Sequence, residues 1–204
     1  SIPWPTFEEF NLKKYKSRDS LAIFSSRGCI SNCIFCNDSP ISKPYRFRRA
    51  NSVFEEIKYH YEANKTREFS FKDLLCNGNI EQLSILCDLI INSGLKISWN
   101  SQAIPRKEMN YDLLRKLKES GCAILIYGVE SFSNNVLKKM NKIFTADIAE
   151  RVIKDSCRAG VGVFINIIVG FPGETEEDFQ QTYEAINRLK PYITEIGAIS
   201  VCLI

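Results

Sequence analysis

Three cysteines stand close together in the stretch SSRGCISNCIFCNDSP at residues 25–40. They are Cys29, Cys33 and Cys36, and thiolates are strong ligands for zinc and for iron–sulfur clusters. Three thiols are too many for one disulfide and one short of a closed four-ligand metal site. The trio therefore predicts either a metal centre with one open coordination position or a buried thiol stripe on a helix, since positions i, i+4 and i+7 share a helix face.

The residues around the trio favour a loop over a helix. Gly28 and the NDSP run are poor helix formers. A structural zinc site would need a fourth Cys or His at ligand spacing, but His60 falls in a predicted helix and the next cysteine, Cys76, is distant in sequence. The favoured interpretation is a [4Fe–4S] cluster held by three thiolates, with one iron open to another ligand.

Apolar runs and helix-boundary residues predict strands alternating with helices. Strands are expected at 21–26, 67–75, 95–104, 122–131, 161–171 and 193–204, and helices at 51–65, 80–94, 111–121, 133–140, 146–160 and 175–190. Ser52 and Thr175 are the expected N-caps of the first and last helices, each with an acidic residue at the capping-box position. The alternation is typical of parallel strands in a doubly wound sheet or in a full or partial β/α barrel, where ligands bind at the carboxyl ends of the strands.

Composition and net charge are those of an ordinary globular protein and exclude few functions. The 204 residues carry a net charge of +3, which by itself indicates neither a nucleic-acid nor a membrane surface. The densest basic run, KPYRFRR at 43–49, is predicted to be a solvated loop. No apolar run reaches the roughly 20 residues of a spanning helix and no signal-peptide pattern opens the chain, so a reducing cytoplasm is expected. The other cysteines are predicted to be small buried thiols: Cys76, Cys87, Cys122, Cys157 and Cys202.

The run CISNCIFC, with Phe35 just before the last cysteine, resembles the signature of the radical S-adenosylmethionine (SAM) enzymes. In that family the motif follows the first strand of a partial or full β/α barrel. The resemblance implies a partial (β/α) barrel of about six parallel strands here. It also implies that Cys29, Cys33 and Cys36 hold a [4Fe–4S] cluster whose open iron is chelated by SAM, which an electron cleaves to methionine and a 5′-deoxyadenosyl radical. Phe35 is expected to pack near the adenine.

Two later segments also resemble the family. YGVESFSNNVLKKMNK at 127–142 is similar to its Gly-x-Glu-Ser…Val-Leu-x-x-Met-x-Lys pattern, and NIIVGFPGETEED at 166–178 to its Gly-x-Pro-Gly-Glu-Thr segment. Glu130 ends an apolar strand, where an unpaired carboxylate is costly, so a ligand hydroxyl or a cation is its expected partner. Asn166 is expected to face the ligand. Gly170 would allow the backbone to approach a flat adenine.

The ends of the second and third strands offer further candidates for SAM contacts. The family's Gly-Gly-Glu run, which contacts the amine of SAM, is absent, and Asp73 could accept the same hydrogen bonds unless it only forms a turn. Asn100 and Gln102 are candidates to contact ribose or carboxylate, or they reflect surface alternation. No catalytic residue beyond the cluster ligands is predicted.

The opening PWPTFEEFNLKKY, followed by RGC, resembles the linker between a cobalamin-binding domain and a radical SAM barrel. Residues 1–18 are therefore expected to be a linker, and residues 19–204 a core domain truncated at its C-terminal end. Cobalamin would be bound by a domain outside this chain. The expected activity is that of a cobalamin-dependent methyltransferase or a related enzyme, with a small-molecule substrate and a flavodoxin or ferredoxin as reductant. The alternatives are a methylthiotransferase acting on tRNA or a ribosomal protein, and an iron–sulfur electron-transfer or sensor module.

Overall fold

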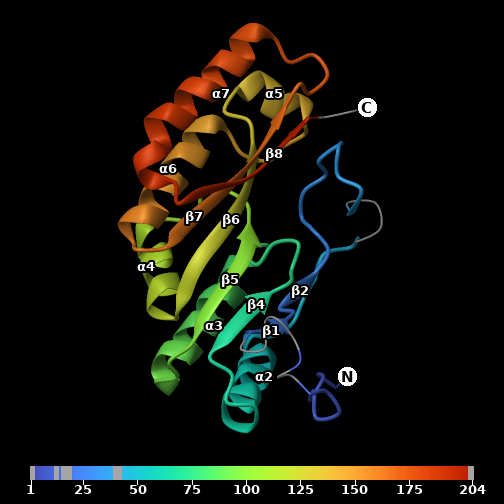
Figure 1. The fold of residues 1–204 in the computed structure, drawn as a ribbon, viewed down its shortest axis with the longest axis vertical. Helices are drawn as coiled ribbons and strands as arrows, with labels where there is room; N and C mark the ends of the chain where they lie inside the picture. Colours follow the sequence, from blue (N-terminus) through green and yellow to red (C-terminus); the bar gives the residue numbers. More distant parts are fainter. Residues whose placement is uncertain (1–2, 12–13, 15–19, 39–42, 202–204) are drawn as a thin grey trace.

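Six strands form one parallel sheet at the centre of the molecule (Figure 1). The structure is a computed structural model that describes residues 3–11, 14, 20–38 and 43–201. Within the sheet the order is β1–β4–β5–β6–β7–β8, with β1 and β8 at the two edges. Its strands are β1 (Ser20–Ile23), β4 (Glu68–Phe71), β5 (Ser98–Ala103), β6 (Cys122–Glu130), β7 (Gly162–Val169) and β8 (Glu195–Val201). Parallel strands that remain open between two edges confirm the partial β/α barrel.

The helices between the strands cover one face of this sheet. They are α2 (Ala50–Ala63), α3 (Ile80–Ser93), α4 (Tyr111–Glu119), α5 (Asn134–Lys139), α6 (Ala146–Arg158) and α7 (Glu176–Leu189), followed by the short 3₁₀ helix η2 (Lys190–Tyr192). Figure 1 shows α4, α6 and α7 on one side of the sheet and the loop that follows β2 (Ser26–Arg27) on the other. The loop with the three cysteines thus lies on the side that these helices leave free.

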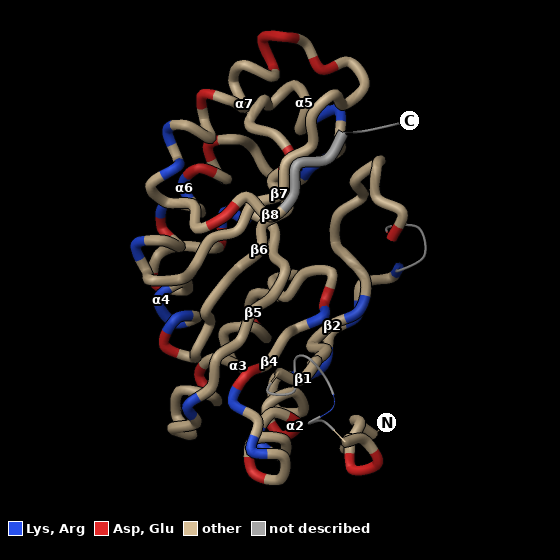
Figure 2. Tube along the Cα trace, viewed as in Figure 1, with Lys and Arg blue, Asp and Glu red and all other residues tan. Residues whose placement is uncertain are grey.

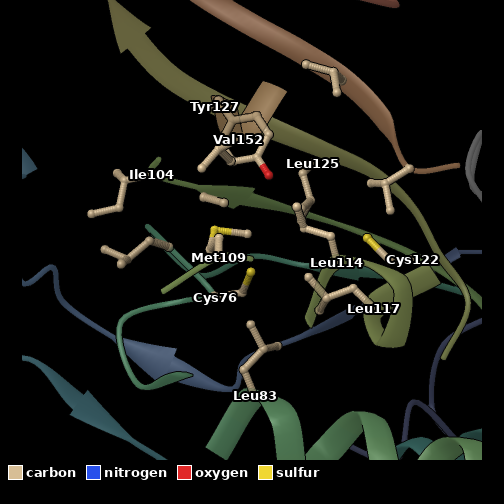
Figure 3. Close-up of a cluster of buried hydrophobic side chains, with 14 of the residues drawn as sticks. Cys76, Leu83, Ile104, Met109, Leu114, Leu117, Cys122, Leu125, Tyr127 and Val152 are labelled. Carbon is tan, nitrogen blue, oxygen red and sulfur yellow. The ribbon is translucent and has the colours of Figure 1, made fainter. Parts of the chain in front are cut away.

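Burial alternates along the strands, as expected of a sheet whose two faces differ. On β6, Leu125, Tyr127 and Val129 are fully buried toward the helices, whereas Ile124 and Ile126 on the opposite face are only partly buried. Figure 3 shows the buried side chains between the sheet and the helices, where the Tyr127 hydroxyl also bonds a serine of α6. The other, open face is the one that can receive a ligand.

Two of the predicted helix boundaries are confirmed and one is wrong. Thr175 and Asp178 form the expected capping box of α7, and Gly94 ends α3 with φ = +70°. Ser52 does not cap α2, which begins at Ala50. The reason is tertiary: the side chain of Gln82 on α3 accepts the hydrogen bond of the Ala50 N–H at 2.8 Å.

Residues 43–49 are mostly exposed to solvent, as predicted, but they do not form a simple loop. This basic arm contains β3 (Arg46–Phe47), which pairs antiparallel with β2. The Tyr45 ring packs so closely on Gly78 that a Cβ there would overlap it. Arg48 donates to the carbonyl of Phe24 at 2.9 Å and forms an ion pair with Glu56 at 2.5 Å. Packing and hydrogen bonds therefore fix the arm to the barrel.

The remaining cysteines follow the prediction where the structure describes them. Cys76, Cys87 and Cys122 are buried, Cys157 is partly buried, and Cys202 lies outside the described residues. None of the described helices is long and apolar enough to cross a membrane.

Candidate cofactor site

The cysteine loop has no helical residue between positions 28 and 37, so the buried helical stripe is excluded. Gly28 turns the chain with φ = +86°, and the Cys36 N–H donates to the Cys33 carbonyl at 3.2 Å. The thiols of Cys29, Cys33 and Cys36 are free and partly exposed. The Ser31 N–H donates to the Cys29 sulfur at 3.4 Å, the kind of bond that tunes iron–sulfur ligands.

This loop is fixed by the segment that follows α5. The Ile34 N–H donates to the Met140 carbonyl at 3.2 Å, and the Asn141 side-chain amide donates to the Asn32 carbonyl at 2.9 Å. Asn141 itself adopts φ = +60°, a conformation that asparagine tolerates better than most residues. The end of the motif at 127–142 therefore sets the position of the cysteine loop.

A buried ion pair lies at the carboxyl end of β6. The Lys142 ammonium is 3.2 Å from a carboxylate oxygen of Glu130 and 3.0 Å from the carbonyl of Gly128. Only 12% of the Glu130 side chain and 5% of the Lys142 side chain are exposed. Burial raises the pKa of Glu130, and the neighbouring ammonium opposes that rise. The cation expected beside Glu130 is thus present within the protein.

The backbone at Glu130 is strained. Glu130 has φ = +69°, which is rare for a residue other than glycine, and the pairing of β6 with β7 shifts register between Gly128 and Glu130. Strained backbone and bulges of this kind cluster at functional sites. The strain turns the Glu130 carboxylate toward Lys142 at the strand end.

Lys142 connects the ion pair to the cysteine loop. Its ammonium lies 5.2 Å from the centre of the Phe35 ring. Burial raises the pKa of the Cys33 thiol, the Lys142 ammonium opposes this, and Cys29, Cys36 and Glu130 add to the rise. All five groups therefore interact electrostatically at one place. Lys142 was not among the predicted site residues, although the quoted motif ends on it and a buried carboxylate requires a cation.

Phe35 packs onto the loops that follow β6 and β7. Its ring meets Phe171 edge-on with centroids 6.4 Å apart, and both rings join a small apolar cluster with Val136 and Met140. This packing holds the last turn of the cysteine loop. A contact of Phe35 with adenine stays a prediction.

Asp73 holds the base of the cysteine loop. One carboxylate oxygen accepts from the Ser25 hydroxyl at 2.8 Å and from the Ser25 N–H at 3.3 Å, and the other accepts from the Ser26 N–H at 2.5 Å. Burial raises the pKa of Asp73 and these hydrogen bonds oppose the rise. These contacts agree with the structural alternative for Asp73, and its contact with SAM stays a prediction.

The other predicted contacts are spread along the open face. Asn100 accepts a bond from the Ser70 hydroxyl at 3.0 Å, and Gln102 is exposed. Gln102 stands opposite Ile126 in register, whereas Asn166 stands opposite Gly128 and so lies closer to the strand end that carries Glu130.

Gly170 lies just beyond β7. It has φ = +75°, and its N–H donates to Glu174 at 2.6 Å. The structure thus groups Asn166 with the Glu130 end of the sheet and places Asn100 and Gln102 further from it.

The donor set of the loop consists of thiols. Among the described residues no group of three Cys, His, Asp or Glu side chains is arranged to hold one metal ion. In a [4Fe–4S] cluster three thiolates would bind three different irons. Three free thiols on one loop, one of them accepting a backbone N–H bond, fit that group.

Comparison with known proteins decides the family. Residues 23–186 match the model of the Radical SAM superfamily. This chain belongs to that superfamily. Radical SAM proteins are enzymes that use a [4Fe–4S] cluster and S-adenosylmethionine, which confirms the family predicted from the sequence.

Several radical SAM proteins resemble the chain over most of its length. It is 30% identical to an uncharacterized methyltransferase of Pyrococcus horikoshii over 92% of this chain and 41% of that protein. It is 29% identical to a tRNA-2-methylthio-N(6)-dimethylallyladenosine synthase of Natranaerobius thermophilus over 86% of this chain and 42% of the relative.

Among solved structures, the radical SAM methyltransferase TsrM of Kitasatospora setae, with cobalamin and a [4Fe–4S] cluster bound, has a similar fold. The TM-score is 0.78 at 19% identity, covering 90% of this chain and 34% of TsrM. The chain thus spans less than half the length of each of these three proteins.

Proposed function

We propose that residues 19–204 are the radical SAM core of a cobalamin-dependent methyltransferase or a related enzyme, and that residues 1–18 are the linker to a cobalamin-binding domain. One observation carries the proposal: the three-cysteine loop is docked beside the buried Glu130–Lys142 pair at the carboxyl end of the sheet. The methyltransferase relative and the fold shared with TsrM support the choice within the superfamily.

The residues of the chain have distinct roles in this proposal. Cys29, Cys33 and Cys36 hold the cluster and leave one iron for SAM. When bound, the cluster supplies the electron that cleaves SAM to methionine and a 5′-deoxyadenosyl radical. Glu130 offers carboxylate oxygens to a ligand hydroxyl, and Lys142 keeps that carboxylate oriented and charged.

Three further groups would complete the SAM site. Asn166 adds an amide donor and acceptor close to the Glu130 end of the sheet. The packed rings of Phe35 and Phe171 would exclude water from one side of the site. Exclusion of water strengthens the polar contacts that hold the ligand.

The test is the product of SAM cleavage. Full-length protein is reconstituted anaerobically with iron and sulfide, then given SAM and dithionite, and 5′-deoxyadenosine is measured. Cys33→Ala is expected to abolish both the visible absorbance of the cluster and the product. Cys157→Ala, which removes a partly buried thiol on α6, is the matched control and keeps both. Correctly clustered protein that forms no 5′-deoxyadenosine would contradict the proposal.

A methylthiotransferase is the second candidate, because the Natranaerobius relative is a methylthio-adenosine synthase. Such an enzyme needs a second cluster domain and an RNA-binding module in the rest of the full-length protein. Iron content after reconstitution, together with transfer of a methylthio rather than a methyl group, distinguishes the two. An electron-transfer or sensor module would form no 5′-deoxyadenosine at all.

A further inference from the structure

A groove of about 600 Å³ lies beside the basic arm. It is bounded by the N-terminal segment at 3–7, the end of β1 and the β2–β3 pair. Its walls include the acid Glu56, four aromatic side chains and three arginines: Trp4, Phe7, Phe24, Phe47, Arg27, Arg46 and Arg48. Figure 2 shows basic residues gathered at β2. The three cysteines and Glu130 do not line this groove, so it is separate from the candidate cofactor site.

Two of these arginines, Arg27 and Arg46, stand opposite each other in the backbone pairing of β2 with β3. Like charges at directly opposite positions repel. Within the described part of the chain neither has an acidic partner: Arg46 donates to the carbonyl of Pro44, and Arg27 lies over the Phe24 ring. Arg48, by contrast, is paired with Glu56. Among the described residues, the groove therefore holds two positive charges that no acidic side chain pairs with.

The fold keeps these two charges together. Tyr45, packed on Gly78, anchors the strand that carries Arg46. Asp73 binds Ser25 and Ser26 and so fixes the strand that carries Arg27. Two like charges on paired backbone positions favour an anion between them, because folding has already brought their two strands together.

We propose that this groove binds a small planar molecule that carries a phosphate, sulfonate or carboxylate group. Guanidinium groups bind such anions through paired, charge-assisted hydrogen bonds. Trp4, Phe24 and Phe47 supply flat apolar walls for the ring of the ligand. The volume suits a small molecule. A nucleic-acid strand would need a longer basic track than two free arginines in a chain of net charge +3. This site goes beyond the proposed function and does not depend on it.

Isothermal titration calorimetry of the full-length protein with phenyl phosphate tests the site, with phenol as the neutral control. Phenyl phosphate is expected to bind at least tenfold more tightly than phenol or inorganic phosphate, and more weakly as salt is raised. Arg46→Gln is expected to weaken phenyl phosphate at least tenfold. Arg115→Gln, which removes an exposed arginine on α4, is the matched control and leaves the affinity unchanged.

A fluorescence titration places the ligand in the groove. Trp4 lines the groove, whereas the other tryptophan, Trp99, is only 2% exposed in the core. Phenyl phosphate is expected to change the tryptophan emission, and Trp4→Phe is expected to remove that change.

Three results would overturn the proposal. They are equal affinity for phenol and phenyl phosphate, unchanged affinity in Arg46→Gln, and displacement of phenyl phosphate by a far lower concentration of single-stranded oligouridylate, which would assign the groove to nucleic acid. Formation of 5′-deoxyadenosine is measured on the same samples. If phenyl phosphate does not bind but 5′-deoxyadenosine is formed, only the proposed anion site is refuted. If phenyl phosphate binds but no 5′-deoxyadenosine is formed, only the proposed radical chemistry is refuted.

Discussion

Replacement of Lys142 by Met tests the buried ion pair most directly. The substitution leaves the Glu130 carboxylate, only 12% exposed, without its cation. Removing one partner of a buried pair lowers the free energy of unfolding by about 3–5 kcal/mol. For a chain of this size such a loss lowers Tm by roughly 10 °C.

The pH dependence of that loss identifies its cause. Burial raises the pKa of Glu130, so its contribution to stability is present at low pH and is lost as pH rises through the folded-state pKa. Without Lys142 the folded-state pKa rises further. The deficit of Lys142→Met is therefore larger at pH 7.5 than at pH 5, because a lower pH favours the protonated carboxyl. Adding Glu130→Gln removes the charge, and the deficit of the double variant is smaller and independent of pH.

Urea unfolding of the apoprotein, followed by circular dichroism at both pH values, measures these differences. Lys154→Met is the control: Lys154 forms a more exposed pair with Glu150 at 3.5 Å, and its loss is worth less than about 1 kcal/mol. A Lys142→Met deficit that is equal at both pH values, and unchanged by Glu130→Gln, would refute the reasoning.

Three further predictions concern stability and are measured by urea unfolding. Asp178→Ala removes the capping box of α7 and lowers the free energy of unfolding by about 2 kcal/mol. Hydrogen bonds hold the pKa of Asp178 well below its usual value. The stability difference between wild type and variant therefore fades as pH falls below about 4, the ordinary pKa of an aspartate. Gly78→Ala drives a Cβ into the Tyr45 ring and costs about 2 kcal/mol, whereas Gly94→Ala meets open space and loses only about 1 kcal/mol through its positive φ. Burial lowers the pKa of His60, so stability falls as pH drops below the ordinary value of 6.5, and His60→Leu removes that fall.

Each of these predictions has an outcome that contradicts it. Equal stability of Asp178→Ala and wild type at pH 7 would mean that the capping box adds nothing to the helix. A Gly78→Ala protein no less stable than Gly94→Ala would mean that the Tyr45 ring does not rest on that glycine. If the free energy of unfolding of His60→Leu falls at low pH as much as that of the wild type, groups other than His60 cause the fall.

The sequence predicts those parts of the fold that depend on neighbouring residues. The capping box of Thr175 and Asp178 needs only positions three apart, and Gly94 ends its helix by its own backbone freedom. The alternation of elements predicts parallel strands but fits a doubly wound sheet as well as a barrel, and the resemblance to the radical SAM family predicted the barrel. Motifs and hydrophobic patterns among neighbouring residues were therefore enough to predict both the family and the parallel sheet.

Contacts between residues far apart in the sequence could not be predicted from patterns among neighbouring residues. The start of α2 depends on Gln82 in another helix, and the basic arm is fixed by Gly78, whose role is to leave space for Tyr45. The same holds for the site: Asp73 meets its partners 47 and 48 positions earlier in the chain. Glu130 could be predicted because it ends an apolar strand, but the choice of Lys142 as its cation depends on how the chain returns after α5.

The hydrogen bond from Asn141 to Asn32 spans 109 positions of sequence. Together with the bond between Ile34 and Met140, it means that the cysteine loop finds its support only after β6 and α5 have formed. During synthesis the thiols leave the ribosome long before that support exists. The cysteine loop can therefore reach its supported conformation only when most of the sheet has folded.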